Sequence, residues 1–208
     1  MLFEQIRIGG DRNFAYLIAG PGRHAALVDP GYSPELLAGR AKELGLTVDY
    51  VLNTHGHPDH NGENEALLRL TGARLAAFGC GDRPLRDDDL LRLDTLELRV
   101  LHTPGHTPDS VCFLAGGKLL TGDTLFVGKI GGTRTEAEAR AEYDSLHRRL
   151  DALPDETEVW PGHDYGVRPS STLGEERRTN PFLLQPDFAS FLHLKQNWAE
   201  YKRRHGIA

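Results

Sequence analysis

The sequence contains little cysteine, with only Cys80 and Cys112 among 208 residues. Two thiols are too few for the disulfide framework of a small secreted protein, and they lack the paired spacing of a zinc ribbon. We therefore expect neither a disulfide-stapled fold nor a cysteine-ligated structural zinc site. This cysteine usage fits a reducing compartment, and we predict a cytoplasmic location.

Basic residues are also too few to dominate the surface. The chain has 24 Lys and Arg against 30 Asp and Glu, which gives a formal net charge of −6. A partner recognised through its phosphate backbone requires clustered Lys and Arg, and the sequence has no dense basic tract. We therefore predict that nucleic acid is neither substrate nor partner.

Long hydrophobic runs are missing as well. The first residues carry Glu4, Arg7 and Asp11 within a short apolar pattern, so they lack the uninterrupted apolar core of a signal peptide. No later run is long enough to cross a bilayer. We expect a soluble protein without a membrane partner.

The apolar residues that are present, 39% of the chain, suffice for one well-packed domain. Helical spacing is clearest at residues 34–44, 63–70 and 136–150. Between and around these stretches lie short β-type runs bounded by Gly, Pro, Asp or Asn, at residues 2–8, 14–19, 25–29, 50–53, 96–101, 111–114 and 158–160. This distribution predicts an α/β fold with two mostly antiparallel sheets packed face to face and helices outside, a four-layer αββα sandwich.

The end of the chain has a different pattern. From about residue 170 small and polar residues come first, and aromatic and aliphatic residues then recur with helical spacing from Phe188 to Tyr201. That spacing is typical of an amphipathic helix. We expect residues 1–169 to form the main domain and residues 170–208 a short C-terminal helical appendage of it.

The densest group of chemically active residues is Thr54-His55-Gly56-His57-Pro58-Asp59-His60, directly after an apolar run. Alternate side chains of an extended segment point the same way, so His55 and His57 can reach one metal ion together. Asp59 and His60, where the chain turns toward the next helix, can point to a second ion. One loop can thus serve two metal ions.

Three further motifs are expected at strand ends, each shaped by Gly or Pro. They are Pro104-Gly105-His106-Thr107, Thr121-Gly122-Asp123-Thr124 and Pro161-Gly162-His163-Asp164. A lone loop histidine is usually solvated or hydrogen-bonded, but five of the ten histidines fall in these four motifs, which coincidence explains poorly. Imidazole and carboxylate ligands suit zinc, iron or manganese.

From about Phe14 to His163 the sequence resembles the metallo-β-lactamase superfamily. The resemblance implies that His55, His57 and His106 bind a first metal ion. It also implies that Asp59, His60 and His163 bind a second, and that Asp123 bridges the two. An Asp at the bridging position is similar to the glyoxalase II, lactonase and phosphodiesterase branches of the superfamily.

Within those branches, Thr121-Gly-Asp-Thr-Leu-Phe-Val-Gly128 resembles glyoxalase II, the hydroxyacylglutathione hydrolases. Tyr165 stands where that family places a substrate-binding Tyr that contacts the glutathione moiety; the alternative role for Tyr165 is an aromatic lid. The family has a long helical C-terminal domain, whereas here only a few dozen residues follow His163. The loop after Asp123 also differs, reading Lys129-Ile-Gly-Gly-Thr-Arg134.

The resemblance implies a dinuclear metal-dependent hydrolase that cleaves a thioester such as S-(2-hydroxyacyl)glutathione. The nucleophile would be a hydroxide bridging two divalent ions, with zinc as the first choice and iron or manganese as alternatives. Asp59 would act as a catalytic residue by accepting a hydrogen bond from that hydroxide and aiming it at the carbonyl. The expected partner is a small-molecule thiol conjugate, and a homodimer is an open option.

Two other functions stay open at this point. Residues 171–181 resemble the ends of both the shorter glyoxalase-II-like proteins and the persulfide (sulfur) dioxygenases. A dioxygenase would use a single iron held by His55, His106 and Asp123 to oxidise glutathione persulfide. The residues Thr124-Leu125-Phe126 after the bridging Asp favour hydrolysis instead. A metal-binding module without catalysis would need the ligands but not Asp59 as an orienting group.

Overall fold

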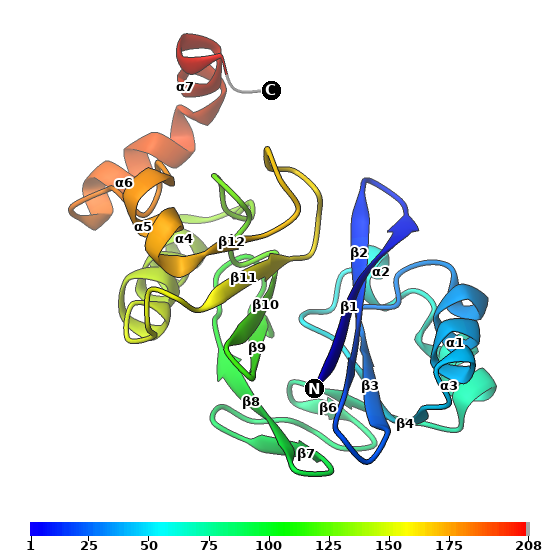
Figure 1. The fold of residues 1–208 in the computed structure, drawn as a ribbon. Helices are drawn as coiled ribbons and strands as arrows, with labels where there is room; N and C mark the ends of the chain where they lie inside the picture. Colours follow the sequence, from blue (N-terminus) through cyan, green and yellow to red (C-terminus); the bar gives the residue numbers. More distant parts are fainter. Residues whose placement is uncertain (207–208) are drawn as a thin grey trace.

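The computed structural model describes residues 1–206, which form two six-stranded sheets packed face to face with helices on both outer faces (Figure 1). The first sheet has the order β1-β2-β3-β4-β5-β6, and the second has the order β12-β11-β10-β9-β8-β7. The first sheet consists of β1 (Leu2–Gly9), β2 (Asn13–Ala19), β3 (His24–Val28), β4 (Thr47–Leu52), β5 (Arg74–Ala77) and β6 (Cys80–Gly81). The second consists of β7 (Leu90–Leu93), β8 (Leu96–His102), β9 (Val111–Ala115), β10 (Lys118–Gly122), β11 (Glu158–Pro161) and β12 (Ser171–Thr172).

Both sheets are mixed but mostly antiparallel. The parallel pairs are β3 with β4, β4 with β5, and β10 with β11. Each of these parallel connections runs through a helix or a long crossover, as parallel pairing requires. The expected four-layer αββα sandwich is therefore confirmed.

The helices divide between the two outer faces. In Figure 1, α1 (Pro34–Glu43) and α3 (Asn64–Thr71) cover the first sheet. The second sheet is covered by α4 (Glu136–Asp144), its π-helical continuation η1 (Ser145–Leu150), α5 (Leu173–Thr179) and α6 (Phe188–Gln196). The short α2 (Pro58–Asn61) lies beside the beginning of β2, and α7 (Trp198–His205) extends beyond the second sheet.

Side-chain alternation along the central strands explains the four layers. In β2, Phe14, Tyr16 and Ile18 join the apolar cluster between the sheets, whereas Leu17 joins the cluster under α1 and α3. In β9, Phe113 faces the same central cluster and Cys112 faces the helices on the other side. Because strands covered on both faces need apolar residues at every position, these segments read as continuous hydrophobic runs.

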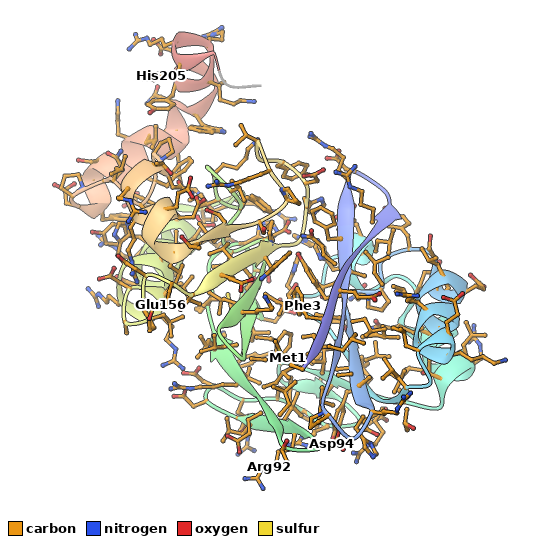
Figure 2. The ribbon with its side chains drawn as sticks, viewed as in Figure 1. Met1, Phe3, Arg92, Asp94, Glu156 and His205 are labelled. Carbon is orange, nitrogen blue, oxygen red and sulfur yellow. The ribbon has the colours of Figure 1, made fainter. Side chains whose placement is uncertain are left out.

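The seam between the sheets is aromatic. Phe3 of β1 lies 4.8 Å, centroid to centroid, from Trp160 of β11, and Figure 2 shows Phe3 at this junction. The hydroxyl of Tyr16 donates a hydrogen bond to the carbonyl of Pro161 at 2.5 Å. Together with the hydrogen bond from the N–H of Phe14 to the carbonyl of Gly162 at 2.9 Å, these contacts hold the beginning of β2 against the end of β11.

One helical expectation needs correction. Residues 136–150 are helical as expected, with α4 continued by a π-helical turn, but the single amphipathic helix expected near the C-terminus is two helices, preceded by α5. The break falls at Asn197, whose side-chain amide donates to the carbonyl of His193 at 2.8 Å. Asn competes for backbone groups in this way and so favours helix ends. Among residues 1–206 no helix is long and apolar enough to cross a membrane.

Candidate metal centre

The four motifs singled out in the sequence converge at one edge of the sandwich. The loop after β4 carries His55 and His57, and α2 carries Asp59 and His60. The loop between β8 and β9 supplies His106, and the residues directly after β10 and β11 supply Asp123 and His163. The ligand atoms of these seven residues form groups in which all atoms lie within 4.8 Å of one another.

The first group consists of His55, His57 and His106. Nδ1 of His57 lies 3.0 Å from Nε2 of His55 and 3.0 Å from Nε2 of His106. Three ring nitrogens therefore point at one common position.

The second group consists of Asp59, His60 and His163. Nε2 of His60 lies 3.2 Å from Nε2 of His163. Oδ2 of Asp59 lies 3.4 Å from the His163 nitrogen and 3.6 Å from that of His60. This group matches the second set expected from the sequence.

Asp123 lies between the two groups. Its Oδ2 is 3.5 Å from Nε2 of His106, and its Oδ1 is 3.4 Å from Nε2 of His60 and 3.5 Å from that of His163. Oδ1 is buried and makes no hydrogen bond to any residue of the described chain. Each carboxylate oxygen thus faces a different histidine group.

This donor set fits divalent metal ions. Ligands at about 2.0–2.1 Å from a tetrahedral ion lie about 3.3–3.4 Å from one another, close to the observed spacings. Ring nitrogens that face each other and a buried carboxylate oxygen without a partner would be unfavourable by themselves. A cation between them satisfies both.

The protonation of His55, His106 and Asp123 is consistent with metal binding. Burial, together with the nearby His60, lowers the pKa of His55 to about 2, so its ring is neutral and available as a ligand. Burial also lowers the pKa of His106. Burial opposes ionisation of Asp123, but the imidazoles of His163 and His60, 3.5 and 3.4 Å from Oδ1, hold the pKa of this carboxyl well below its usual range.

Outer hydrogen bonds orient several of the rings, and most of these partners were not predicted. Nδ1 of His106 donates to the carbonyl of Gly132 at 2.8 Å, and Nδ1 of His163 donates to the carbonyl of Asp11 at 2.9 Å. Buried Asp29 lies 3.1 Å from Nδ1 of His60. A donor bond at Nδ1 leaves Nε2 free as the ligand atom. Asp29 could have been found, since it lies beside Pro and Gly at the end of an apolar strand, as several of the predicted ligands do.

The mouth of the centre is aromatic and cationic. The ring of Tyr165 stacks on His163 at 4.5 Å, and its hydroxyl donates to Oδ2 of Asp11 at 2.6 Å. Cζ of Arg12 lies 4.9 Å from the Tyr165 ring centroid and Nζ of Lys129 lies 5.4 Å from it. A cavity of about 430 Å³ opens here, lined by Arg12, Asp123, Phe126, Lys129, Ile130, Gly131, Gly132, Tyr165 and Lys202.

The cations at this mouth repel one another. Burial lowers the pKa of Lys129, and the positive charges of Lys202 and Arg12 lower it further. An anion bound among these groups would relieve the repulsion.

Comparisons with known proteins agree with this geometry. Residues 8–79 and 80–163 match the model of the Metallo-beta-lactamase superfamily. A hydroxyacylglutathione hydrolase from Anaeromyxobacter dehalogenans (strain 2CP-C) is 36% identical over 221 residues, which cover 88% of this chain and 86% of that protein.

Two solved structures are similar in fold. The crystal structure of ETHE1 from Myxococcus xanthus superposes with a TM-score of 0.87 at 37% identity, covering 95% of this chain and 91% of that one. The crystal structure of TTHA1623 in a di-iron-bound form superposes with a TM-score of 0.72 at 32% identity, covering 86% of this chain and 100% of that one.

Proposed function

This chain belongs to the metallo-beta-lactamase superfamily, and from that premise we propose that it is a dinuclear metal-dependent hydrolase acting on a thioester such as S-(2-hydroxyacyl)glutathione. The hydroxyacylglutathione hydrolase that it resembles over most of both chains supports this substrate class. The observation that carries the proposal is Asp123, whose Oδ2 faces His106 of one ligand group and whose Oδ1 faces His60 and His163 of the other.

In this proposal His55, His57 and His106 hold one ion, Asp59, His60 and His163 hold the other, and Asp123 contacts both. When bound, two divalent cations lower the pKa of a shared water and polarise the carbonyl under attack. Zinc is our first choice because imidazole and carboxylate ligands suit it. Iron and manganese accept the same ligands. The di-iron-bound form of TTHA1623 supports iron as the alternative to zinc.

Asp59 is the proposed catalytic residue. Nδ2 of Asn13 donates to both the carbonyl and Oδ2 of Asp59 at 3.1 Å, which fixes the orientation of this side chain. The Asp59 side chain is 35% exposed, more than the other residues of its group. It can therefore accept a hydrogen bond from the attacking water and direct it at the substrate.

Tyr165 and the cations beside it are the proposed binding site for the thiol carrier. A small thiol conjugate such as glutathione carries carboxylates, and guanidinium and ammonium groups bind carboxylates through charge-assisted hydrogen bonds. The mutual repulsion of Arg12, Lys129 and Lys202 supports the choice of an anionic carrier.

We further propose that residues 170–208 belong to the same domain as residues 1–169. In support, β12 pairs with β11, and Leu173, Phe182 and Phe191 join the apolar cluster under the second sheet. The cytoplasmic location, the homodimer, and the lack of membrane and nucleic-acid partners stay predictions, which cell fractionation, light scattering and binding assays would test.

The rival function is a mononuclear iron dioxygenase acting on glutathione persulfide. The similarity to ETHE1 from Myxococcus xanthus gives it some weight. A single iron would leave a complete second ligand group without a role, which favours the hydrolase.

One pair of assays separates the two functions. Zinc-loaded protein should release thiol from S-lactoylglutathione in the absence of oxygen, and elemental analysis should give about two metal ions per chain. About one iron per chain, with oxygen consumption on glutathione persulfide and no thioester hydrolysis, would establish the dioxygenase instead.

A further inference from the structure

A buried ion pair connects two helices on the outer face of the second sheet. Lys195 of α6 contacts the carboxylate of Glu142 of α4, and the side chains are 11% and 1% exposed. Burial raises the pKa of Glu142 to about 7, while the neighbouring Lys195 opposes that shift. Nζ of Lys195 also donates a hydrogen bond to the carbonyl of Gly131 at 2.9 Å. The pair therefore reaches beyond the two helices to the loop that follows Asp123.

The loop segment Gly131-Gly132 is in direct contact with two candidate metal ligands. A Cβ at Gly131 would lie 2.2 Å from the carbonyl oxygen of Asp123 and 2.9 Å from Nδ1 of His106, so only glycine allows this approach. The next carbonyl, that of Gly132, accepts the Nδ1 hydrogen bond of His106 at 2.8 Å. The position of this segment thus sets the orientation of the His106 ring.

The other half of the ion pair supports the other side of the same ligand. Gly105, which precedes His106, packs against α4 so closely that a Cβ there would lie 2.3 Å from Cβ of Glu142. One turn further on, Oγ of Ser145 donates to the carbonyl of Pro104 at 2.8 Å. His106 is therefore held from its backbone side by α4 and from its ring side by the Gly131-Gly132 segment.

We infer that Lys195 is a positioning residue for the metal ligand His106: by joining Glu142 to the carbonyl of Gly131, it fixes the two surfaces between which the imidazole is held. The inference rests on the proposed metal-ligating role of His106 and is independent of which substrate is cleaved. It also gives the C-terminal segment a defined part in the metal centre, because α6 supplies this ammonium group. Hydrogen-bond partners behind metal-ligating histidines typically change metal affinity by about 10–100-fold when removed.

The test isolates the bond between Lys195 and Gly131. Lys195→Met alone would leave a buried carboxylate unpaired, which destabilises the fold for a different reason. We therefore compare Glu142→Gln, which keeps the lysine, with the double variant Glu142→Gln/Lys195→Met. Metal-free protein is titrated with Zn²⁺ against a chromophoric chelator, and thermal unfolding of the same metal-free samples is recorded separately. Glu142→Gln/Lys195→Gln, which replaces the pair with two amides, gives the same comparison if the first double variant does not fold.

Two further variants serve as references. His106→Ala reports the loss of one metal ligand, and Lys118→Met removes a more exposed ion pair, with Glu158, at the other end of β10 and β11. We expect the double variant to bind one of two zinc ions about 10–100-fold more weakly than Glu142→Gln does. Lys118→Met should change the unfolding temperature without changing zinc affinity.

The outcomes separate the positioning role of Lys195 from the assignment of His106 as a metal ligand. If the double variant binds both ions as tightly as Glu142→Gln while His106→Ala loses one, Lys195 has only a structural role and the inference is wrong. If His106→Ala keeps both ions at full affinity, the ligand assignment itself is wrong.

Discussion

Oδ2 of Asp29 lies 3.1 Å from Nδ1 of His60, and both side chains are only 1% exposed. The same carboxylate accepts hydrogen bonds from the backbone N–H and the hydroxyl of Thr54, each at 2.7 Å. Burial opposes the charged form of His60, but its hydrogen bond with Asp29 raises the pKa of His60 to about 9. The buried carboxylate of Asp29 therefore orients His60, a candidate ligand of the second group. It also orients Thr54, which precedes His55 of the first group.

Replacing Asp29 with Asn should weaken zinc binding by about 10–100-fold, because an uncharged amide polarises the His60 ring less than a carboxylate does. Competition with a chromophoric chelator measures the change. Asp49→Asn is the matched control. Asp49 pairs with His24 on the surface at 2.8 Å, and neither residue belongs to the candidate metal centre. Equal affinities for the two variants would contradict an orienting role for Asp29.

Replacing Asp123 with Ala should remove both metal ions and nearly all hydrolysis, because this residue contacts both ligand groups. Elemental analysis of the purified variant gives the metal content per chain. Glu65→Gln, whose side chain is 92% exposed on α3, should keep full occupancy. A variant of Asp123 that retains two ions would count against the bridging role.

The candidate ligands could be singled out in the sequence because their spacing is local or their setting repeats. His55, His57, Asp59 and His60 fall in one loop, and the three other motifs share the pattern of a polar residue beside Gly or Pro at a strand end. The main strands could be located because β2, β3, β4 and β9 are buried on both faces and so read as apolar runs.

The features that could not be predicted from the sequence depend on contacts between distant segments. The strand β10 was missed although Asp123 was expected at a strand end; its burial against β9 and β11 is a tertiary property. The bond between Lys195 and Gly131 spans 64 positions, and no periodicity relates the two residues. The spacing of the two cysteines does not distinguish them, yet Cys80 lies exposed in the short edge strand β6 and Cys112 is buried.

Replacing Lys129 with Met should raise KM for an anionic thioester by about tenfold and leave kcat nearly unchanged. A charge-assisted hydrogen bond contributes about 1.5–3 kcal/mol, and a contact made equally in the ground and transition states alters only KM. Steady-state kinetics with a glutathione thioester and with its neutral diester tests the idea. The variant and the parent protein should have the same KM for the diester. Lys42→Met in α1 should have the KM of the parent protein for both substrates.

The two cysteines should differ sharply in reactivity. Cys80 is exposed, whereas Cys112 is fully buried beside Thr103, at 3.5 Å from its hydroxyl. Because the thiolate is the reactive form, iodoacetamide at pH 8 should modify one thiol quickly and the second only after unfolding. Mass spectrometry of Cys80→Ser identifies the slow site. Rapid labelling of Cys112 in the folded variant would show that the layer between the second sheet and its helices opens readily.

The burial of Cys112 also predicts a loss of stability at high pH. Burial raises the pKa of this thiol from 9.0 to about 11, so the folded state keeps a proton that the unfolded chain loses. The contribution of this pKa difference to the free energy of unfolding is fully present below pH 9. It is lost as the pH rises toward 11, at about 1.4 kcal/mol per pH unit. Urea unfolding of the parent protein and of Cys112→Ala across this pH range measures the contribution of Cys112, as the difference between the two free energies of unfolding. The alanine variant should be less stable at pH 8 because a buried side chain has been shortened, and the gap should narrow as the pH rises. A gap that stays constant up to pH 11 would mean that Cys112 ionises in the folded protein as readily as in the unfolded chain.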